Sequence, residues 1–222
     1  MCGRFTLAVE DAELQVEFPE MELPAQFAAR YNIAPSQPVL AIPNDGRNKA
    51  DFFVWGLIPS WAKDPSIGTR LINARAETLA EKPSFRGSYK HKRCLIPADG
   101  FYEWQSTSGK QAKVPHYIQM KDRKPFAFAG LWSEWRGPDG SELRSCTIIT
   151  TQPNELMAPI HSRMPAILRA EDRMKWLEPV AGTPEELAQL LQPYPSELMR
   201  AFRVSTLVNS PAADLPECIV PA

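Results

Sequence analysis

The 222-residue sequence has no apolar run of the roughly 18 residues that a membrane-spanning helix requires. Its first twenty residues lack a basic stretch followed by an apolar one, so they do not match a secretory signal, and we expect a cytoplasmic protein. Cysteine is scarce, and Cys2, Cys94, Cys146 and Cys218 form no C-x-x-C pair. This spacing disfavours a zinc site or a redox-active dithiol, and in a reducing compartment the four thiols are expected to be free.

Proline is instead abundant, with 22 residues, about twice its average share of a chain. These prolines are scattered, so they predict turns and strand ends and not a linker. A hydrophobic share of 44% and a charged share of 23% are ordinary for a globular protein with a sizeable core. Since no internal repeat or linker divides the chain, we expect one domain over residues 1–222.

Charge is nearly balanced, with 25 Lys and Arg against 26 Asp and Glu, which by itself predicts no polyanionic partner. Residues 61–93 differ, because eight basic and three acidic side chains give this segment +5 and leave −6 for the remainder. A local basic excess is typical of a groove for phosphates, and a solvated surface explains it equally well.

Short apolar runs bounded by Pro, Gly, Asn or Asp predict strands of a sheet that is closed or packed on itself. The runs are RFTLAV (4–9), QPVLAIP (37–43), DFFVWGLIP (51–59), KRCLIPA (92–98), GFYEW (100–104), PHYIQM (115–120), PFAFAGLW (125–132) and CTIIT (146–150). Helices are predicted over residues 10–18, 170–180 and 182–193, the last with a capping box of Thr183 and Glu186. The fold class is therefore α+β, a β-rich core with peripheral helices.

Cys2 directly follows Met1. If Met1 is removed, Cys2 carries a free α-amine and a thiol on one residue. An aldehyde is then attacked by the amine to give a Schiff base, which the thiol closes into a five-membered thiazolidine ring. A terminal cysteine without a role is the alternative, and this residue alone favours it.

The segment LINARAET (71–78) places Asn73, Arg75 and Glu77 at alternating positions. In an extended backbone all three side chains point to one side, where they could bind sugar and phosphate oxygens. An exposed polar strand face with a weak Arg75–Glu77 pair is the simpler alternative.

Two further groups could handle protons. Glu103 lies among the aromatic residues of PADGFYEW (97–104), and such surroundings raise the pKa of a carboxyl toward neutrality. A position on the wet face of an edge strand is an equal alternative. His161 lies in the proline-flanked segment MAPIHSRMPAIL (157–168), a loop setting suited to a proton shuttle, although a structural histidine fits as well.

Taken in order, MCGRF, YNIAPSQPV, WGLIPSW, LINARAET, CLIPADGFYEW and HSRMP resemble the motifs of the SRAP family (SOS-response-associated peptidase domain proteins). The resemblance runs from residue 2 to about residue 168 and returns in RVSTLVNS. It implies an irregular, barrel-like β core and a sensor of abasic sites in single-stranded DNA. Such proteins trap the ring-opened sugar aldehyde as a thiazolidine DNA–protein crosslink.

On this resemblance Cys2 is the crosslinking residue after removal of Met1, and Asn73 orients the terminal amine and the sugar. Glu103 and His161 handle protons during Schiff-base formation, ring opening and crosslink reversal. The resemblance implies no cofactor and no metal, and we expect a monomer whose partner is single-stranded DNA with an abasic site.

DNA contacts are implied at Arg75, which matches a phosphate contact, and at Trp61, which matches an aromatic beside the lesion; Arg4 and Arg86 are weaker matches along the backbone groove. Phe85 and Tyr89 are further candidate stacking platforms among the basic residues. Some relatives carry two adjacent tryptophans where this chain has Trp61 followed by an alanine, which predicts a smaller wedge beside the lesion.

Other functions stay open at this point. Cys2 could be the nucleophile of a thiol hydrolase activated by His161, as the family's peptidase name suggests. A non-catalytic module that only binds single-stranded DNA is a second alternative. Strand cleavage by β-elimination is a third activity, because it starts from the same Schiff base.

Overall fold

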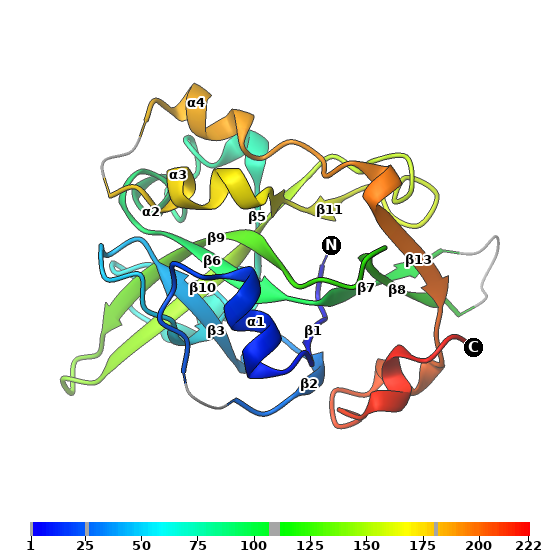
Figure 1. The fold of residues 1–222 in the computed structure, drawn as a ribbon. Coiled ribbons are helices and arrows are strands. Elements are labelled where there is room, and N and C mark those ends of the chain that lie inside the picture. Colours follow the sequence, from blue (N-terminus) through cyan, green and yellow to red (C-terminus); the bar gives the residue numbers. More distant parts are fainter. Residues whose placement is uncertain (1, 25–26, 107–111, 180–181) are drawn as a thin grey trace.

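The computed structural model describes residues 2–24, 27–106, 112–179 and 182–222 (Figure 1). The strands are β1 (Phe5–Leu7), β2 (Arg30–Ile33), β3 (Pro38–Pro43), β4 (Asp51–Trp55), β5 (Asn73–Arg75), β6 (Arg93–Ala98), β7 (Gly100–Gln105), β8 (Val114–Met120), β9 (Phe126–Arg136), β10 (Glu142–Thr151), β11 (Met164–Pro165), β12 (Ile167–Leu168) and β13 (Met199–Arg203). The α-helices are α1 (Asp11–Glu17), α2 (Arg86–His91), α3 (Arg173–Leu177) and α4 (Pro184–Gln189), and short 3₁₀ helices include Pro65–Arg70, Ala76–Thr78, Thr206–Asn209 and Pro216–Ile219.

A closed barrel forms the centre of the fold. Its strands pair in the order β10-β4-β3-β6-β9, and β9 pairs with β10 to complete the ring. The strand β10 runs parallel to β4 and, further along, to β5, whereas the other pairings in the ring are antiparallel. Strands β6 and β9 are buried along nearly their whole length because helices cover them: the indole of Trp176 in α3 donates to the carbonyl oxygen of Cys94 at 3.0 Å.

A second sheet, which we call the N-terminal sheet, pairs its strands in the order β13-β8-β7-β1-β2. Phe5 in β1 joins it to the barrel, because its ring meets Trp55 and Phe128 edge to face with centroids 5.2 and 5.6 Å apart. On its other face Tyr102, Tyr117 and their aromatic neighbours form a separate cluster. Both faces of β1 are therefore buried.

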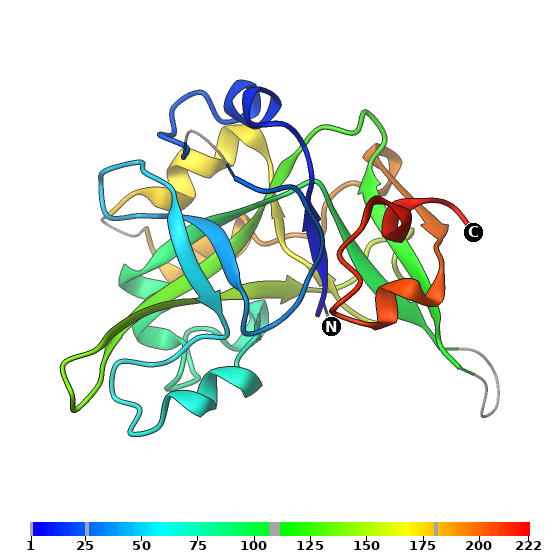
Figure 2. The ribbon, with the colours of Figure 1, turned by 90° about the horizontal axis from the view of Figure 1, so that it is seen from below.

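The C-terminal segment after β13 packs beside β1 and β2 and closes this aromatic cluster (Figure 2). Asn32 holds it in place, since its side-chain amide donates to the carbonyl oxygens of Val208, Ser210 and Ala213 at 3.2, 2.9 and 2.7 Å. The carboxylate of Asp214 accepts from two backbone amides of β2 and from Arg30. The C-terminal residues are thus part of the same structural unit as the N-terminal sheet.

The predicted fold class is confirmed: the protein is a β-rich α+β fold with a barrel and short peripheral helices. The eight predicted strands match β1, β3, β4, β6, β7, β8, β9 and β10, and the predicted capping box at α4 is present. The helix predicted over residues 170–180 is confirmed only as a 3₁₀ turn followed by α3, and residue 180 lies outside the described residues. In the described part of the chain, no helix is long and apolar enough to cross a bilayer.

Candidate active site

Cys2 is completely buried at the head of β1. The antiparallel register pairs Phe5 with Phe101, and the amide of Tyr102 donates to the carbonyl oxygen of Arg4 at 3.0 Å. Continued toward the N-terminus, this register puts Gly3 opposite Glu103. Cys2 directly precedes Gly3, and it lies close enough to Glu103 for the charge of that carboxylate to act on its thiol. Sheet pairing therefore places together two predicted site residues that are about a hundred positions apart in the chain.

The surroundings of Cys2 keep its thiol protonated. Burial raises the pKa of this thiol far above its ordinary value, and the nearby Glu103 carboxylate raises it further. The only side-chain hydrogen bond described for the thiol is a long one, 3.8 Å from Sγ to the carbonyl oxygen of Arg4. Reactive thiolates need the opposite setting, with positive charge that lowers the pKa.

Glu103 is only 2% exposed and lies on β7, between β1 and β8. The alternative of a wet position on an edge strand is therefore wrong. Burial raises the pKa of the Glu103 carboxyl, and the nearby charge of His161 acts in the opposite direction. A carboxyl with a raised pKa can both accept and donate a proton close to neutral pH.

His161 reaches this site from the loop between β10 and β11. The side-chain amide of Gln105, at the end of β7, donates to the carbonyl oxygen of Pro159 at 3.0 Å and ties the loop to the N-terminal sheet. The backbone amide of His161 donates to Met157 at 2.9 Å, which turns the chain back on itself. The ring is half-buried, and its Nδ1 accepts from the backbone amide of Arg163 at 3.0 Å. His161 thus lies close enough to Glu103 for its charge to act on that carboxyl, which itself acts on the Cys2 thiol.

Asn73 lies in β5, alongside Ile148 of β10. Its Nδ2 donates to the carbonyl oxygen of Ile148 over 3.4 Å, while its Oδ1 is buried and accepts no hydrogen bond from the described residues. A buried acceptor of this kind is costly to leave unpaired, so it is suited to an N–H or O–H donor of a bound substrate.

The prediction that Asn73, Arg75 and Glu77 all point to one side is wrong for Glu77. The extended backbone ends at Arg75, and Glu77 lies in the following 3₁₀ helix. The weak Arg75–Glu77 pair is also not the contact found, because Glu77 pairs with Arg163 at 2.6 Å. Arg75 is exposed.

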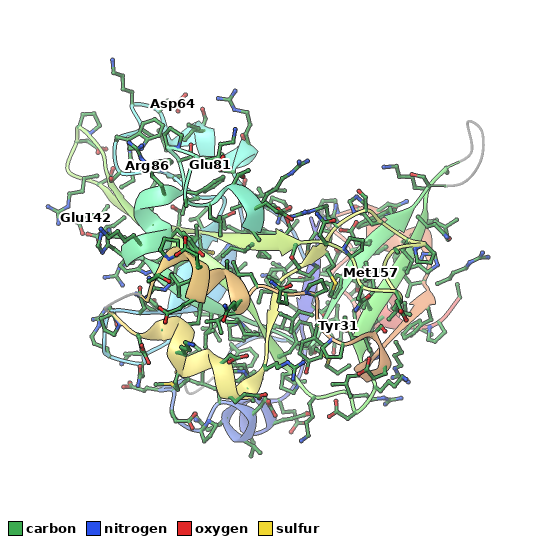
Figure 3. The ribbon with its side chains drawn as sticks, turned by 90° about the horizontal axis from the view of Figure 1, so that it is seen from above. Tyr31, Asp64, Glu81, Arg86, Glu142 and Met157 are labelled. Carbon is green, nitrogen blue, oxygen red and sulfur yellow. The ribbon has the colours of Figure 1, made fainter. Side chains whose placement is uncertain are left out.

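Most basic side chains of residues 61–93 are exposed on the surface. They are Lys63, Arg70, Arg75, Lys82, Arg86 and Lys90. Arg93 is an exception, since it is fully buried and donates to backbone carbonyls, including that of Trp176 at 2.9 Å. Figure 3 shows Arg86 at one end of the molecule with Asp64 and Glu81, away from Met157, which precedes the His161 loop.

Trp61 is the exposed aromatic of this segment, with 59% of its surface open to solvent. The prediction that Phe85 and Tyr89 are stacking platforms is wrong, because both are buried. The loop that carries Trp61 is closed at its base by two glycines: a Cβ on Gly56 would lie 2.6 Å from the carbonyl oxygen of Gly68. Gly56 also has a φ of +135°, which only glycine adopts readily.

A cavity of about 350 Å³ lies beside Trp61. Its lining includes the basic side chains of Arg86 and Lys92, the imidazole of His91 and several serines. Among the residues the structure describes, no group of three or more His, Cys, Asp or Glu is placed to hold a metal ion.

Arg4, the fourth residue matched to DNA binding, is used inside the protein. Its guanidinium donates to Asn32 and to the carbonyl oxygens of Val208 and Asn209 at 2.8, 2.8 and 3.2 Å, and it lies 6.0 Å from the ring of Trp104. It connects the start of the chain to the C-terminal segment. The contacts with Val208 and Asn209 cannot be predicted from the sequence, because these acceptors are backbone oxygen atoms 204 and 205 positions away.

The chain is similar in sequence and fold to known proteins. The model of a family described as SOS response associated peptidase (SRAP) matches residues 1–211. The abasic site processing protein YoqW of Bacillus subtilis (strain 168) is 52% identical over 222 residues, which cover 99% of each chain, and YoaM of the same organism, also described as an abasic site processing protein, is 48% identical over 99% of this chain and 97% of its own. A crystal structure of a protein from Bacteroides thetaiotaomicron is similar over the full length of both chains, with a TM-score of 0.88 and 29% identity.

Proposed function

Because the chain belongs to the SOS response associated peptidase (SRAP) family, we propose that it is an abasic site processing protein that acts on single-stranded DNA. In this proposal Cys2, freed by removal of Met1, traps the aldehyde of the ring-opened abasic sugar. The product is a thiazolidine that joins the protein to the strand and shields the lesion.

The chemistry balances without a cofactor. The α-amine of Cys2 adds to the aldehyde carbon, and the resulting carbinolamine loses one water to give an imine. The Cys2 sulfur then bonds to the same carbon, and the thiol proton ends on the imine nitrogen. The net reaction of amine, thiol and aldehyde is ring formation with release of one water.

The observation that carries this proposal is that Cys2 lies near Glu103: the register of β1 and β7 puts Gly3 opposite Glu103, and the Glu103 charge acts on the adjacent Cys2 thiol. Glu103 accepts the proton of the amine or of the thiol, and its raised pKa suits it to return that proton later. His161 donates a proton to the ring oxygen of the sugar as the ring opens, and later to the carbinolamine hydroxyl that leaves as water. Asn73 offers its buried Oδ1 to the N–H of the Cys2 amine.

The strand is held by charge and stacking. Trp61 stacks on a base next to the lesion, Arg75 and Arg86 contact phosphates, and Arg4 contributes only at the start of the groove, since its guanidinium is already engaged. These contacts position the DNA without reading its sequence, so affinity depends on salt and not on the bases.

A thiol hydrolase acting through a Cys2 thiolate is disfavoured by the raised pKa of that thiol. The peptidase activity of the family name fits best as removal of Met1 from the chain itself. Because the imine can also lead to β-elimination, a variant that forms the imine but cannot close the ring should act as a lyase.

A variant with one residue inserted ahead of Cys2 tests the proposal, since its Cys2 nitrogen is an amide. Incubated with an abasic single-stranded oligonucleotide, this variant and Cys2→Ala should give no covalent species on a denaturing gel, whereas the unaltered protein should give one. Full crosslinking by the inserted variant would contradict the mechanism. Unchanged non-covalent affinity in both variants shows that the fold is intact.

A further inference from the structure

Glu77 and Arg163 form a bidentate ion pair that joins two segments far apart in the chain. The Nη1 of Arg163 lies 2.6 Å from Oε1 of Glu77, and its Nη2 lies 2.9 Å from Oε2. The side chain of Arg163 is only 11% exposed, whereas that of Glu77 is 42% exposed. The hydrogen bonds from Arg163 hold the pKa of the Glu77 carboxyl below its ordinary value, so the pair is charged at neutral pH.

The same guanidinium is fixed to the barrel. Its Nη2 also donates to the carbonyl oxygen of Thr150, near the end of β10, at 2.6 Å. Thr150 pairs with Arg75 of β5 on one side and with Pro165 of β11 on the other. A planar guanidinium that makes a two-point contact with a carboxylate and a third with this carbonyl has a single orientation.

Arg163 in turn sets the state of His161. Its backbone amide donates to Nδ1 of the imidazole at 3.0 Å, and its carbonyl oxygen lies 3.2 Å from the same nitrogen. When a backbone N–H donates to Nδ1, the neutral ring carries its proton on Nε2. When the ring is protonated, the carbonyl oxygen can accept from Nδ1–H. The Arg163 backbone thus serves both charge states of a proton donor.

We propose that Glu77 is a positioning residue for His161: by locking Arg163 against β10, it holds the backbone that fixes the Nε2–H tautomer and aims that N–H at the sugar oxygen. This role rests on the proposed function for its consequence in catalysis, but the tautomer itself exists without DNA. Among the described residues no hydrogen bond or ion pair joins Glu77 to Cys2, so its effect passes through Arg163.

The tautomer can be measured directly, because the chain has only three histidines. Nitrogen-15 NMR of the imidazole rings, with His161→Gln to assign the signals, reports which nitrogen carries the proton. We expect one Nε2–H tautomer for His161 in the unaltered protein and a mixture of both in Glu77→Gln. The matched control is Glu81→Gln, which removes the same charge from an exposed side chain of the neighbouring turn and should leave the tautomer unchanged.

Kinetics give the second readout. In Glu77→Gln the rate of crosslinking to an abasic oligonucleotide should fall about tenfold, which is in the range for a displaced catalytic group, while affinity for the undamaged oligonucleotide does not fall. Arg163→Lys should show the same loss, and the double variant should be no slower than either single one, because both changes break one linkage. A single Nε2–H tautomer in Glu77→Gln, or additive losses in the double variant, would overturn the positioning role. Absence of crosslinking in every protein, with the tautomer shift present, would instead overturn the proposed function alone.

Discussion

Replacing Glu103 by glutamine should lower the rate of crosslinking and raise the free energy of unfolding at pH 8. Burial raises the pKa of this carboxyl, so between the pKa of an unfolded glutamate, about 4.3, and the higher folded value, the native state holds a proton that the unfolded chain releases. The stability from this proton is complete below about pH 4.3 and is lost as pH rises through the folded pKa. Each unit by which folding raises this pKa costs the native state about 1.4 kcal/mol once the carboxyl is ionised. Glutamine carries no charge, so Glu103→Gln should recover this free energy at pH 8, and not at pH 4, where the carboxyl is protonated.

The same substitution removes a general acid–base group, so the crosslinking rate should fall roughly 100-fold or more. Thermal unfolding at pH 4 and pH 8 measures the first effect, and single-turnover crosslinking measures the second. Glu142→Gln, on an exposed residue at the tip of the β9–β10 hairpin, should change neither by much. Unchanged rate in Glu103→Gln, or a stability loss that is the same at both pH values, would refute the role assigned to this carboxyl. Loss of non-covalent DNA affinity would show that Glu103 is structural.

Three further changes have distinct outcomes. Trp61→Ala should weaken binding of single-stranded DNA by about 1–3 kcal/mol, roughly 5- to 150-fold by fluorescence anisotropy, with an unchanged melting temperature because the side chain is exposed; equal affinity would exclude stacking at this residue. Asn32→Ala should lower the unfolding free energy by about 2–4 kcal/mol in denaturant titration, since three hydrogen bonds to the C-terminal segment are lost, and a smaller change would mean that Arg4 and Asp214 hold that segment without Asn32. Cys2→Ser should nick an abasic strand more than the unaltered protein does, because the imine persists; an uncleaved strand would count against an imine intermediate.

The strands with strong local signals were predictable from the sequence. β3, β6 and β9 are largely apolar runs bordered by Pro, Gly, Asn or Asp, and burial on both faces leaves such runs without alternation. β5 and β13 were not predicted, because their short polar sequences are held in strand form by their partners β10 and β8. Local propensity carries little information about a strand of this kind.

The sequence alone identifies Cys2, Glu103 and His161 as candidates from their chemistry, and their role stays a prediction. That Cys2 and Glu103 lie close together is visible only in the structure, where β1 pairs with β7 so that Gly3 faces Glu103. The exposure of individual side chains was the hardest property to predict. Phe85 and Tyr89 alternate with basic residues in the sequence, yet both rings face the core. The number of charged residues in a segment does not show whether an aromatic side chain of that segment faces solvent or the core.

The link between Glu77 and Arg163 could not be predicted either. In the sequence, the nearest basic residue to Glu77 is Arg75, two positions away. Glu77 instead pairs with Arg163, which is 86 positions away. Such a contact depends on the register of β5 and β11 against β10, which a single sequence does not reveal.

The most direct test of the account is the intact mass of the protein after incubation with an abasic single-stranded oligonucleotide. The account predicts a product equal to the chain without Met1 plus the oligonucleotide minus one water, whose amount does not depend on added borohydride because the closed ring needs no reduction to be stable. A product that still contains Met1, or one seen only after borohydride reduction, would contradict the thiazolidine at Cys2.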